Sequence, residues 1–263
     1  MDQAERAGRY QAERYLAGEP LDLMAQEFAP SSEAEAYDVQ RGYVAQLGAS
    51  RGALGGYKIA YTSAVMRESR GIKAPCTGRL FASEIVDSPA EIRAADFVSP
   101  AIECEVAARL GSDVAPSGVP WTREAIGAHV EALMTAFEVV DQRPSRGPEG
   151  VDPAVAGVVT NISGAGAVLG PAVREWGSLD LAGARGVMSI NGEQVGEGLG
   201  ADVMGHPLEA LAWLANALAA RGEQLRAGDL VITGSIIPPK PLAAGDVATI
   251  SVEGLGEAEL RVA

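Results

Sequence analysis

Cysteine is scarce in this 263-residue sequence, which contains only Cys76 and Cys104. Two cysteines are too few for a disulfide framework, and their separation does not match a metal-binding motif. A reducing cytoplasm is therefore the expected compartment. The first twenty residues are charged and contain no apolar segment, so they predict no secretory signal.

Long apolar runs and positive charge are also in short supply. No uncharged apolar stretch approaches the roughly 18 residues that a membrane-spanning helix requires, so we expect a soluble protein. Lys and Arg number 21 against 35 Asp and Glu, a formal net charge of −14. Such an acidic surface disfavours nucleic acid and anionic membranes as partners. It does not exclude a small anionic substrate, which responds to the local field of one site.

The residues of nucleophilic catalysis are largely missing. The sequence has no G-x-S-x-G motif, and its two histidines, His129 and His206, both occur in helical patterns. His206 precedes a proline at a helix start, where a capping role is expected. The glycines of 196–200 lack the spacing and the strand-to-helix context of a dinucleotide site, so we expect a loop there.

The first fifty residues predict helices. One helix is expected over residues 3–16. A second begins at Ser32, where Ser32-x-x-Glu35 has the form of a capping box, and ends near Gly48. This helical N-terminal region, residues 1–50, is expected to form one integrated domain with the rest of the chain.

Residues 51–263 have the short, Gly- and Pro-punctuated apolar segments of a β-rich body. Asn191-Gly192 predicts a hairpin turn, and His206-Pro207 predicts the start of a helix that ends near Gly222. A further helix is expected over Thr122–Thr135. The expected strands are 55–63, 78–86, 100–110, 136–141, 157–163, 166–170, 186–195, 229–236 and 246–262. Helices followed by such a body predict an α+β fold with a mixed sheet.

The segment AIECEVAA, residues 101–108, places two carboxylates in an apolar strand. Residues two apart share a face, so Glu103 and Glu105 lie together, while Cys104 faces the core. A third glutamate, Glu138, occurs in the apolar segment TAFEVVD. Three carboxylates that converge would suit Mg²⁺, which prefers oxygen ligands. The alternative is that these glutamates lie on the surface of an edge strand.

Lys58 occupies a similar position in GGYKIAYTS. A lysine in such a strand can act as a general acid or base, or can bind an anion. The alternative is a surface lysine whose stem covers apolar neighbours.

Taken in order, several segments resemble the 2-keto-4-pentenoate hydratase / 4-oxalocrotonate decarboxylase family of the fumarylacetoacetate hydrolase superfamily. They cover almost the whole chain beyond about residue 35, and MGHPLEALAWLAN is the most distinctive. The matching segments are AEAYDVQRGYVAQLG, GYKIAYTSAVM, PAIECEVA, AFEVVDQR, VVTNISGAG, INGEQVGEGLG, MGHPLEALAWLANALAARG, AGDLVITGSIIPP and AGDVATISVEGLGEAEL.

The resemblance implies a fold, a set of ligands and an assembly. The body would be a mixed β-roll or sandwich of the fumarylacetoacetate hydrolase C-terminal type, in a homo-oligomer. Glu103, Glu105 and Glu138 would bind Mg²⁺ or Mn²⁺, and Lys58 would lie beside the substrate as the catalytic residue. Further candidates for substrate binding are Thr62, Ser63, Asn161, Ser163 and Ser235.

The sequence departs from the family pattern in three places. Cys76-Thr77-Gly78 stands where many members carry Asp-Tyr-Gly, which removes a carboxylate that could transfer protons. Ala60-Tyr61 replaces Gly-Leu and adds bulk. Thr160 replaces the Asp of the DNxS motif. These differences affect the expected substrate more than the metal site.

The expected activity is a divalent-metal-dependent hydratase, a lyase of aromatic catabolism in a meta-cleavage pathway. It would add water to a 2-hydroxy-2,4-dienoate or 2-oxo-enoate and give a 4-hydroxy-2-oxo acid. The alternatives are a 4-oxalocrotonate-type decarboxylase, another tautomerase or C–C hydrolase of the superfamily, and a catalytically silent homologue. The catalytic histidine of the superfamily's C–C hydrolases has no evident counterpart here.

Overall fold

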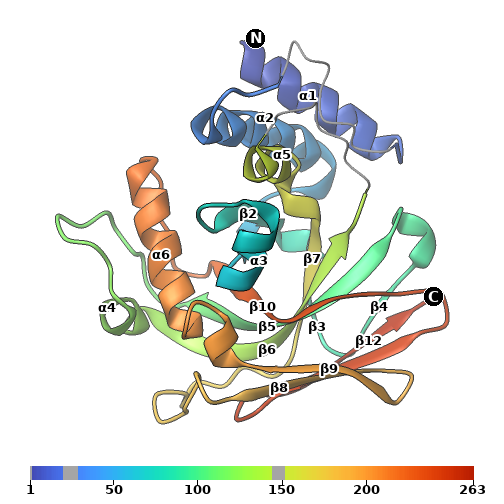
Figure 1. Ribbon diagram of the computed structural model, residues 1–263, viewed down its shortest axis with the longest axis vertical. Helices are drawn as coiled ribbons and strands as arrows, with labels where there is room; N and C mark the ends of the chain where they lie inside the picture. Colours follow the sequence, from blue (N-terminus) through green and yellow to red (C-terminus); the bar gives the residue numbers. More distant parts are fainter. Residues whose placement is uncertain (1, 20–28, 144–151) are drawn as a thin grey trace.

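The computed structural model describes residues 2–19, 29–143 and 152–263. Figure 1 shows a group of helices at one end of the molecule, above two curled sheets. These helices are α1 (Gln3–Leu16), α2 (Glu33–Arg51) and α5 (Pro153–Val159). In the part of the chain that the structure describes, no helix combines the length and apolar character needed to cross a bilayer.

The larger sheet has seven strands in the order β2-β1-β10-β5-β6-β7-β3. It is mixed, because β1 runs parallel to β10 and β3 parallel to β7, while the other neighbours are antiparallel. The strands are β1 (Leu54–Ala60), β2 (Cys76–Phe81), β3 (Ile85–Asp87), β5 (Pro100–Leu110), β6 (Val130–Asp141), β7 (Gly164–Leu169) and β10 (Leu230–Pro241).

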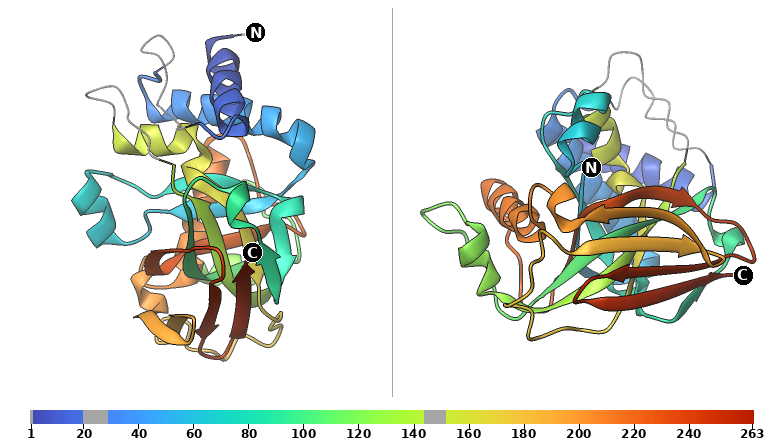
Figure 2. Two further views of the ribbon diagram at one scale, coloured as in Figure 1. Left: turned by 90° about the vertical axis from the view of Figure 1, so that its right-hand side faces the viewer. Right: turned by 60° about the horizontal axis from the view of Figure 1, so that its bottom comes forward.

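The smaller sheet has five strands in the order β4-β12-β11-β8-β9. One face of the larger sheet packs against it, with Cys104, Phe137, Met188 and Ile250 in a shared apolar core. Figure 2 shows the curvature of this sheet and helix α6 (Pro207–Ala220) beside it. The strands are β4 (Ala90–Ile92), β8 (Arg185–Ile190), β9 (Glu193–Leu199), β11 (Val247–Val252) and β12 (Gly256–Val262).

Short helices connect these strands. They are α3 (Ala64–Arg70), α4 (Arg123–Gly127), and the 3₁₀ helices η2 (Ala82–Glu84), η3 (Ala94–Asp96), η4 (Asn161–Ser163) and η5 (Gly200–Asp202). The predicted α+β class is confirmed, with a helical N-terminal region followed by mixed sheets that pack as a sandwich.

The N-terminal helices share apolar clusters with the body. Tyr37 and Val39 of α2 pack with Cys76 of β2 and Val158 of α5. In addition, the Arg143 guanidinium donates to the Tyr15 carbonyl at 2.8 Å, while it pairs with Asp141 at the end of β6. This shared packing supports our proposal that residues 1–50 and 51–263 form one integrated domain.

Several local predictions are confirmed. Helix α1 has the predicted bounds, and Ser32 caps α2 by accepting a hydrogen bond from the Glu35 amide at 3.2 Å. The Glu35 carboxylate, however, accepts from the amide of Ser31 and not from that of the N-cap residue, as a full capping box requires. The hairpin turn at Asn191-Gly192 joins β8 to β9, and the His206 ring caps α6.

Three predictions of secondary structure are wrong. The single strand expected over 78–86 is instead β2 and β3, with the 3₁₀ helix η2 between them. The helix expected over 122–135 is only α4, because β6 begins at Val130 and pairs with β5 along nearly its whole length. Sheet pairing here overrides the helix propensity of the Ala, Leu and Met residues. The strand expected over 157–163 is instead the end of α5 and the turn η4. Asp152 caps α5 and a proline opens it, and both are helix-start signals that the strand interpretation overlooked.

Gly56 allows the close packing of β1 against β10 to be tested. A Cβ at this position would overlap the carbonyl oxygen of Leu230, the neighbour of Gly56 on β10. We expect Gly56→Ala to lower the free energy of unfolding by about 3 kcal/mol, because one of the two paired strands has to move. Denaturant unfolding measures this loss.

Gly71 is the matched control for this substitution. It adopts the left-handed α conformation, with φ +69° and ψ +20°, and no neighbour lies near the added Cβ, so Gly71→Ala should cost only about 1 kcal/mol of backbone strain. Equal losses for the two variants would show that the β1–β10 approach is not tight.

Candidate metal centre

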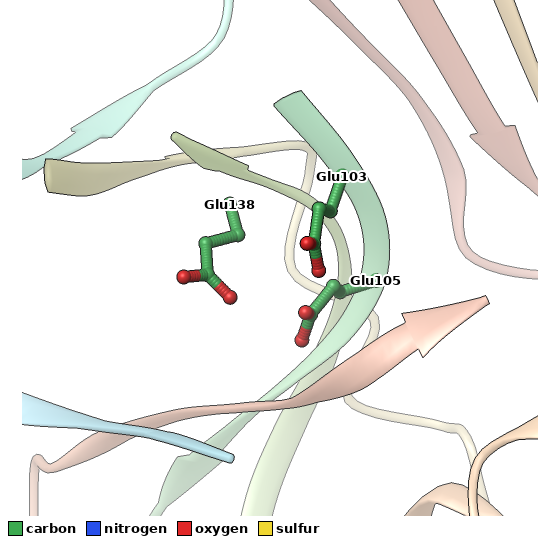
Figure 3. A group of neighbouring side chains, drawn as sticks. All are labelled: Glu103, Glu105 and Glu138. Atoms are coloured by element: carbon green, nitrogen blue, oxygen red, sulfur yellow. The ribbon is translucent and has the colours of Figure 1, made fainter. Parts of the chain in front are cut away.

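The three glutamates come together on interior strands of the larger sheet. Glu103 and Glu105 lie on β5, and Glu138 lies on β6 directly opposite Glu103 in the antiparallel register. Figure 3 shows the three carboxylates facing one another, and one oxygen from each lies within 4.8 Å of the others. The surface alternative therefore does not describe their position, since Glu105 and Glu138 are each 1% exposed.

Hydrogen bonds compensate only part of this charge. The Glu105 carboxylate accepts from the Gly234 amide at 2.6 Å through Oε2, while Oε1 is buried with no hydrogen-bond partner among the described residues. Glu138 forms an ion pair with the ammonium of Lys58. One ammonium against three carboxylates leaves a deficit that protons or a cation must supply.

The pKa values of the carboxyl groups show the same deficit. Burial, helped by the charge of Glu138, raises the pKa of Glu103 to about 7. The same two causes raise the pKa of Glu105 well above its ordinary value. Burial alone would lower the pKa of Lys58, but the Glu138 and Glu103 carboxylates outweigh it, so this pKa lies above its usual value.

The donor set fits a hard divalent cation. All three groups are carboxylates, and no Cys or His belongs to the cluster. Oxygen-only ligands favour Mg²⁺, Mn²⁺ or Ca²⁺ over the softer metals that bind thiolate or imidazole. The unpartnered Oε1 of Glu105 provides a free acceptor in the same space.

Lys58 extends to this cluster from β1. It is 2% exposed, so it is not the surface lysine of the alternative interpretation. Its ammonium donates to the Ile162 carbonyl at 2.9 Å and pairs with Glu138. Its stem passes between two glycines, since a Cβ at Gly78 or Gly164 would lie 2.7 or 3.1 Å from Lys58 side-chain carbons.

Two other candidate residues lie close to the cluster, Ser235 directly and Thr62 by way of Gly234. Thr62 is buried against Gly234, whose amide binds Glu105. Ser235 is paired with Glu105 across β5 and β10, and its hydroxyl lies beside Glu103 and donates to the Ile237 carbonyl.

The remaining candidates lie at the two turns that flank Lys58. Ser63 is the N-cap residue of α3, where its side chain makes no capping hydrogen bond. Asn161 and Ser163 belong to η4. Both amide atoms of Asn161 engage the backbone of Arg79 on β2.

The turn η4 has an unusual backbone that sequence reasoning missed. Asn161, Ile162 and Ser163 all have positive φ, between +51° and +57°. Asn adopts this conformation readily, but a branched residue such as Ile pays about 1–2 kcal/mol for it. The contribution of Ile162 to Lys58 is a backbone carbonyl, which no side-chain pattern reveals. The asparagine before a Gly-rich stretch is the one signal for the turn.

The two cysteines take no part in the cluster. Cys104 is buried in the core on the opposite face of β5, as predicted. Cys76 is buried in an apolar cluster with α2 and α5, and burial raises the pKa of its thiol to about 12.

Comparison with known proteins gives one consistent result. The family model for the fumarylacetoacetate (FAA) hydrolase C-terminal domain matches residues 62–263. A 2-hydroxyhexa-2,4-dienoate hydratase of Comamonas testosteroni is 38% identical over 208 residues, covering 78% of this chain and 77% of the relative. A 4-oxalocrotonate decarboxylase of Pseudomonas putida is 31% identical over 206 residues, with coverage of 78% and 76%.

The solved structures include a relative over nearly the full length. The 4-oxalocrotonate decarboxylase from Pseudomonas putida G7, complexed with magnesium and adipate, is 29% identical and has a TM-score of 0.88. The match covers 99% of this chain and 97% of that chain.

The carboxylate cluster predicts a specific dependence of stability on pH. Because the pKa of Glu103 is raised to about 7, the metal-free native state holds more protons than the unfolded chain between the ordinary glutamate pKa and pH 7. Stability should fall as pH rises through this interval, by up to about 1.4 kcal/mol per pH unit for each proton. Bound Mg²⁺ replaces these protons, so it should raise the Tm more at about pH 8 than at about pH 5. Thermal unfolding with and without Mg²⁺ measures both effects.

Two variants test whether the carboxylate cluster causes this dependence of stability on pH. Glu103→Gln should lessen the fall in stability by the share of one proton, whereas Glu131→Gln, which alters a surface pair with Arg174 at the start of β6, should leave the fall unchanged. A Mg²⁺-induced change in Tm that is independent of pH would contradict the prediction.

Proposed function

The chain belongs to the fumarylacetoacetate hydrolase family, and from this premise we propose that it is a divalent-metal-dependent lyase. Its reaction adds water to a 2-hydroxy-2,4-dienoate or 2-oxo-enoate and gives a 4-hydroxy-2-oxo acid. The observation that carries the proposal is the buried cluster of three carboxylates with the Lys58 ammonium beside it. The similarity to a 2-hydroxyhexa-2,4-dienoate hydratase supports the substrate class.

Glu103, Glu105 and Glu138 would hold Mg²⁺ or Mn²⁺. When bound, the ion supplies Lewis-acid stabilisation of negative charge on the substrate's 2-oxygen. The carboxylates would fix its position, because they come from two adjacent strands in direct register. The amide of Gly234 orients the Glu105 carboxylate and leaves Oε1 available.

Lys58 would contact the substrate. An ammonium group has three protons, and in Lys58 two are directed to the Ile162 carbonyl and to Glu138. The third proton is available to a substrate carboxylate or to a carbon atom that receives a proton. The raised pKa keeps the group cationic near neutral pH, which suits an anion anchor or an acid better than a base.

The proposed hydration consists of a ketonisation followed by the addition of water. Ketonisation moves the 2-hydroxyl proton to C5 and leaves a 2-oxo-3-enoate. Water then adds its hydroxyl group to C4 and its remaining proton to C3. Ser235 lies beside Glu103, and Thr62 packs against Gly234, the partner of Glu105, so their hydroxyl groups could bind the acid end of the substrate. Ser63, Asn161 and Ser163 remain candidates on the two adjoining turns.

Decarboxylation is the second candidate function. The full-length structural match to a 4-oxalocrotonate decarboxylase favours it. Both reactions require an enolate at C2 and C3, so the same centre would serve either. A histidine-dependent C–C hydrolase has less support, because His206 caps α6, and His129 bonds Ser112 at 2.9 Å and packs edge-to-face against Trp121.

We also propose an oligomeric state and a cellular compartment. A homo-oligomer is expected from the family resemblance. A reducing cytoplasm suits two free, buried cysteines.

A metal-dependent assay tests the function. We expect the Mg²⁺-loaded protein to hydrate 2-hydroxypenta-2,4-dienoate, to lose activity on chelation, and to regain it on addition of Mg²⁺. Glu105→Gln should abolish Mg²⁺ binding without unfolding, because it removes one ligand charge and also relieves carboxylate repulsion. Dienoate absorbance follows turnover, and calorimetry measures Mg²⁺ binding.

Three outcomes would decide between the candidates. Release of CO₂ from 4-oxalocrotonate, faster than hydration, would favour the decarboxylase. A fully active, metal-free Glu105→Gln protein would exclude the metal mechanism. Tight Mg²⁺ binding without turnover of any tested 2-oxo acid would indicate a catalytically silent homologue.

The role of Lys58 is tested by Lys58→Met, which keeps the length of the stem but removes the charge. We expect kcat to fall by about 100-fold or more, the range typical for loss of a positioned acid or base. Mg²⁺ binding should persist, because the three carboxylates remain. Steady-state kinetics together with Mg²⁺ titration measure the two effects separately. A kcat within about twofold of the wild type would refute the assignment.

A further inference from the structure

We propose that Asn161 is a positioning residue for Lys58. Its side chain ties the turn η4 to β2, and the turn presents the Ile162 carbonyl that fixes the Lys58 ammonium beside Glu138. The inference rests on the proposed catalytic role of Lys58. It gives Asn161 a role that does not require contact with the substrate.

The Asn161 side chain is hydrogen-bonded to the edge of the larger sheet. The Arg79 amide donates to Asn161 Oδ1 at 2.6 Å, and Asn161 Nδ2 donates to the Arg79 carbonyl at 2.8 Å. Because β2 is an edge strand, the outward amide and carbonyl of Arg79 have no further strand to pair with. The Asn161 side chain, 4% exposed, pairs with both of them. It therefore fixes the turn to the strand next to β1, which carries Lys58.

The turn η4 has a conformation that its own residues do not favour. Three consecutive residues, 161–163, have positive φ. Local preference explains the first residue, since Asn visits the left-handed region, but it opposes the same conformation at Ile162. A contact outside the turn must therefore hold it. The two bonds to Arg79 are such a contact, and their consequence is that the Ile162 carbonyl accepts from Lys58 at 2.9 Å.

The Lys58 stem is enclosed by two glycines and the turn. Gly78 on β2 and Gly164 at the start of β7 line it, and a Cβ on either would lie 3.1–3.3 Å from the Asn161 carbonyl as well as close to the stem. A free lysine stem has four rotatable bonds and loses much entropy when one conformer is selected. The glycines, the turn and Glu138 together select one conformer before any substrate arrives.

Asn161 could bind the substrate or position Lys58, and kinetics distinguish these two roles. If its amide bound the substrate, it would first have to leave Arg79, and its removal would raise KM. If it positions Lys58, its removal lowers kcat and leaves substrate affinity and Mg²⁺ binding largely unchanged, because a displaced catalytic group mainly affects the transition state.

The test is Asn161→Gly, which removes the amide but tolerates positive φ. We expect kcat to fall by about tenfold or more, with KM and the Mg²⁺ dissociation constant within about threefold of the wild type. Asn191→Gly is the matched control. Asn191 also has positive φ, and its amide also makes two hydrogen bonds, to Asp246 and Val247, but it lies on the β8–β9 hairpin. This control should retain wild-type kcat.

A double-mutant cycle tests whether Asn161 acts through Lys58. In the Lys58→Met background, Asn161→Gly should change kcat by less than about twofold, because there is no ammonium left to position. An equal loss in both backgrounds, a wild-type kcat in the single variant, or a rise confined to KM would overturn the inference.

A crystal structure of Asn161→Gly gives a readout that does not depend on activity. We expect the Lys58 Nζ to lie beyond about 3.5 Å from the carbonyl of residue 162, outside hydrogen-bond range. An unmoved Lys58 would overturn the inference even if the wild-type protein hydrated none of the tested acids, in which case the proposed function would also fail on its own. If Asn161→Gly does not fold, Gly78→Ala displaces the same stem, because its Cβ would lie 2.7 Å from the Lys58 Cγ. Gly78→Ala should lower kcat with unchanged Mg²⁺ affinity, and wild-type kcat for Gly78→Ala would then refute the inference.

Discussion

Repulsion among three buried carboxylates is the constraint on which this structure depends. Glu103, Glu105 and Glu138 share a small space, and the only ammonium beside them within the described residues is that of Lys58. Left metal-free, such a cluster binds protons, as the raised pKa values of Glu103 and Glu105 show. The centre is therefore a stability cost that the rest of the sheet offsets and a cation can relieve. A cation-binding role is the physical reason to keep three acids there.

The apolar face of the larger sheet offsets the stability cost of the carboxylate cluster. The same alternation that directs Glu103 and Glu105 into the cluster directs Ile102, Cys104 and Val106 into the apolar core against the smaller sheet. A slip of one residue in β5 would bury the acids in that core, so the register is strongly specified. The direct pairing of Glu103 with Glu138 follows from this register. The site is accurate because it lies on interior strands and not on loops.

The sequence predicted the parts of the site that depend on side-chain alternation. Strand β5 has the predicted bounds, and its two faces divide as expected between acids and core. The same reasoning misplaced β6, because Ala, Leu and Met favour a helix until a paired neighbour makes a strand the better solution. It also could not provide the partners of Lys58. One partner is a backbone carbonyl in a left-handed turn. The two glycines along the stem contribute by having no Cβ, which leaves room for the Lys58 side chain.

The residues around the cluster limit which groups can transfer protons there. The position at which many members of the resembled family carry an aspartate holds Cys76, whose thiol is buried among α2 and α5 with its pKa raised to about 12. The next residue, Thr77, is held by Tyr37, Gln40 and Arg221, so it is also committed to packing. Neither residue can supply an acid or base near neutral pH. We propose that Lys58 and water carry the proton transfers at this centre. An ammonium group with this role has to be held in one place, which gives a reason for the strained turn and for the two glycines along its stem.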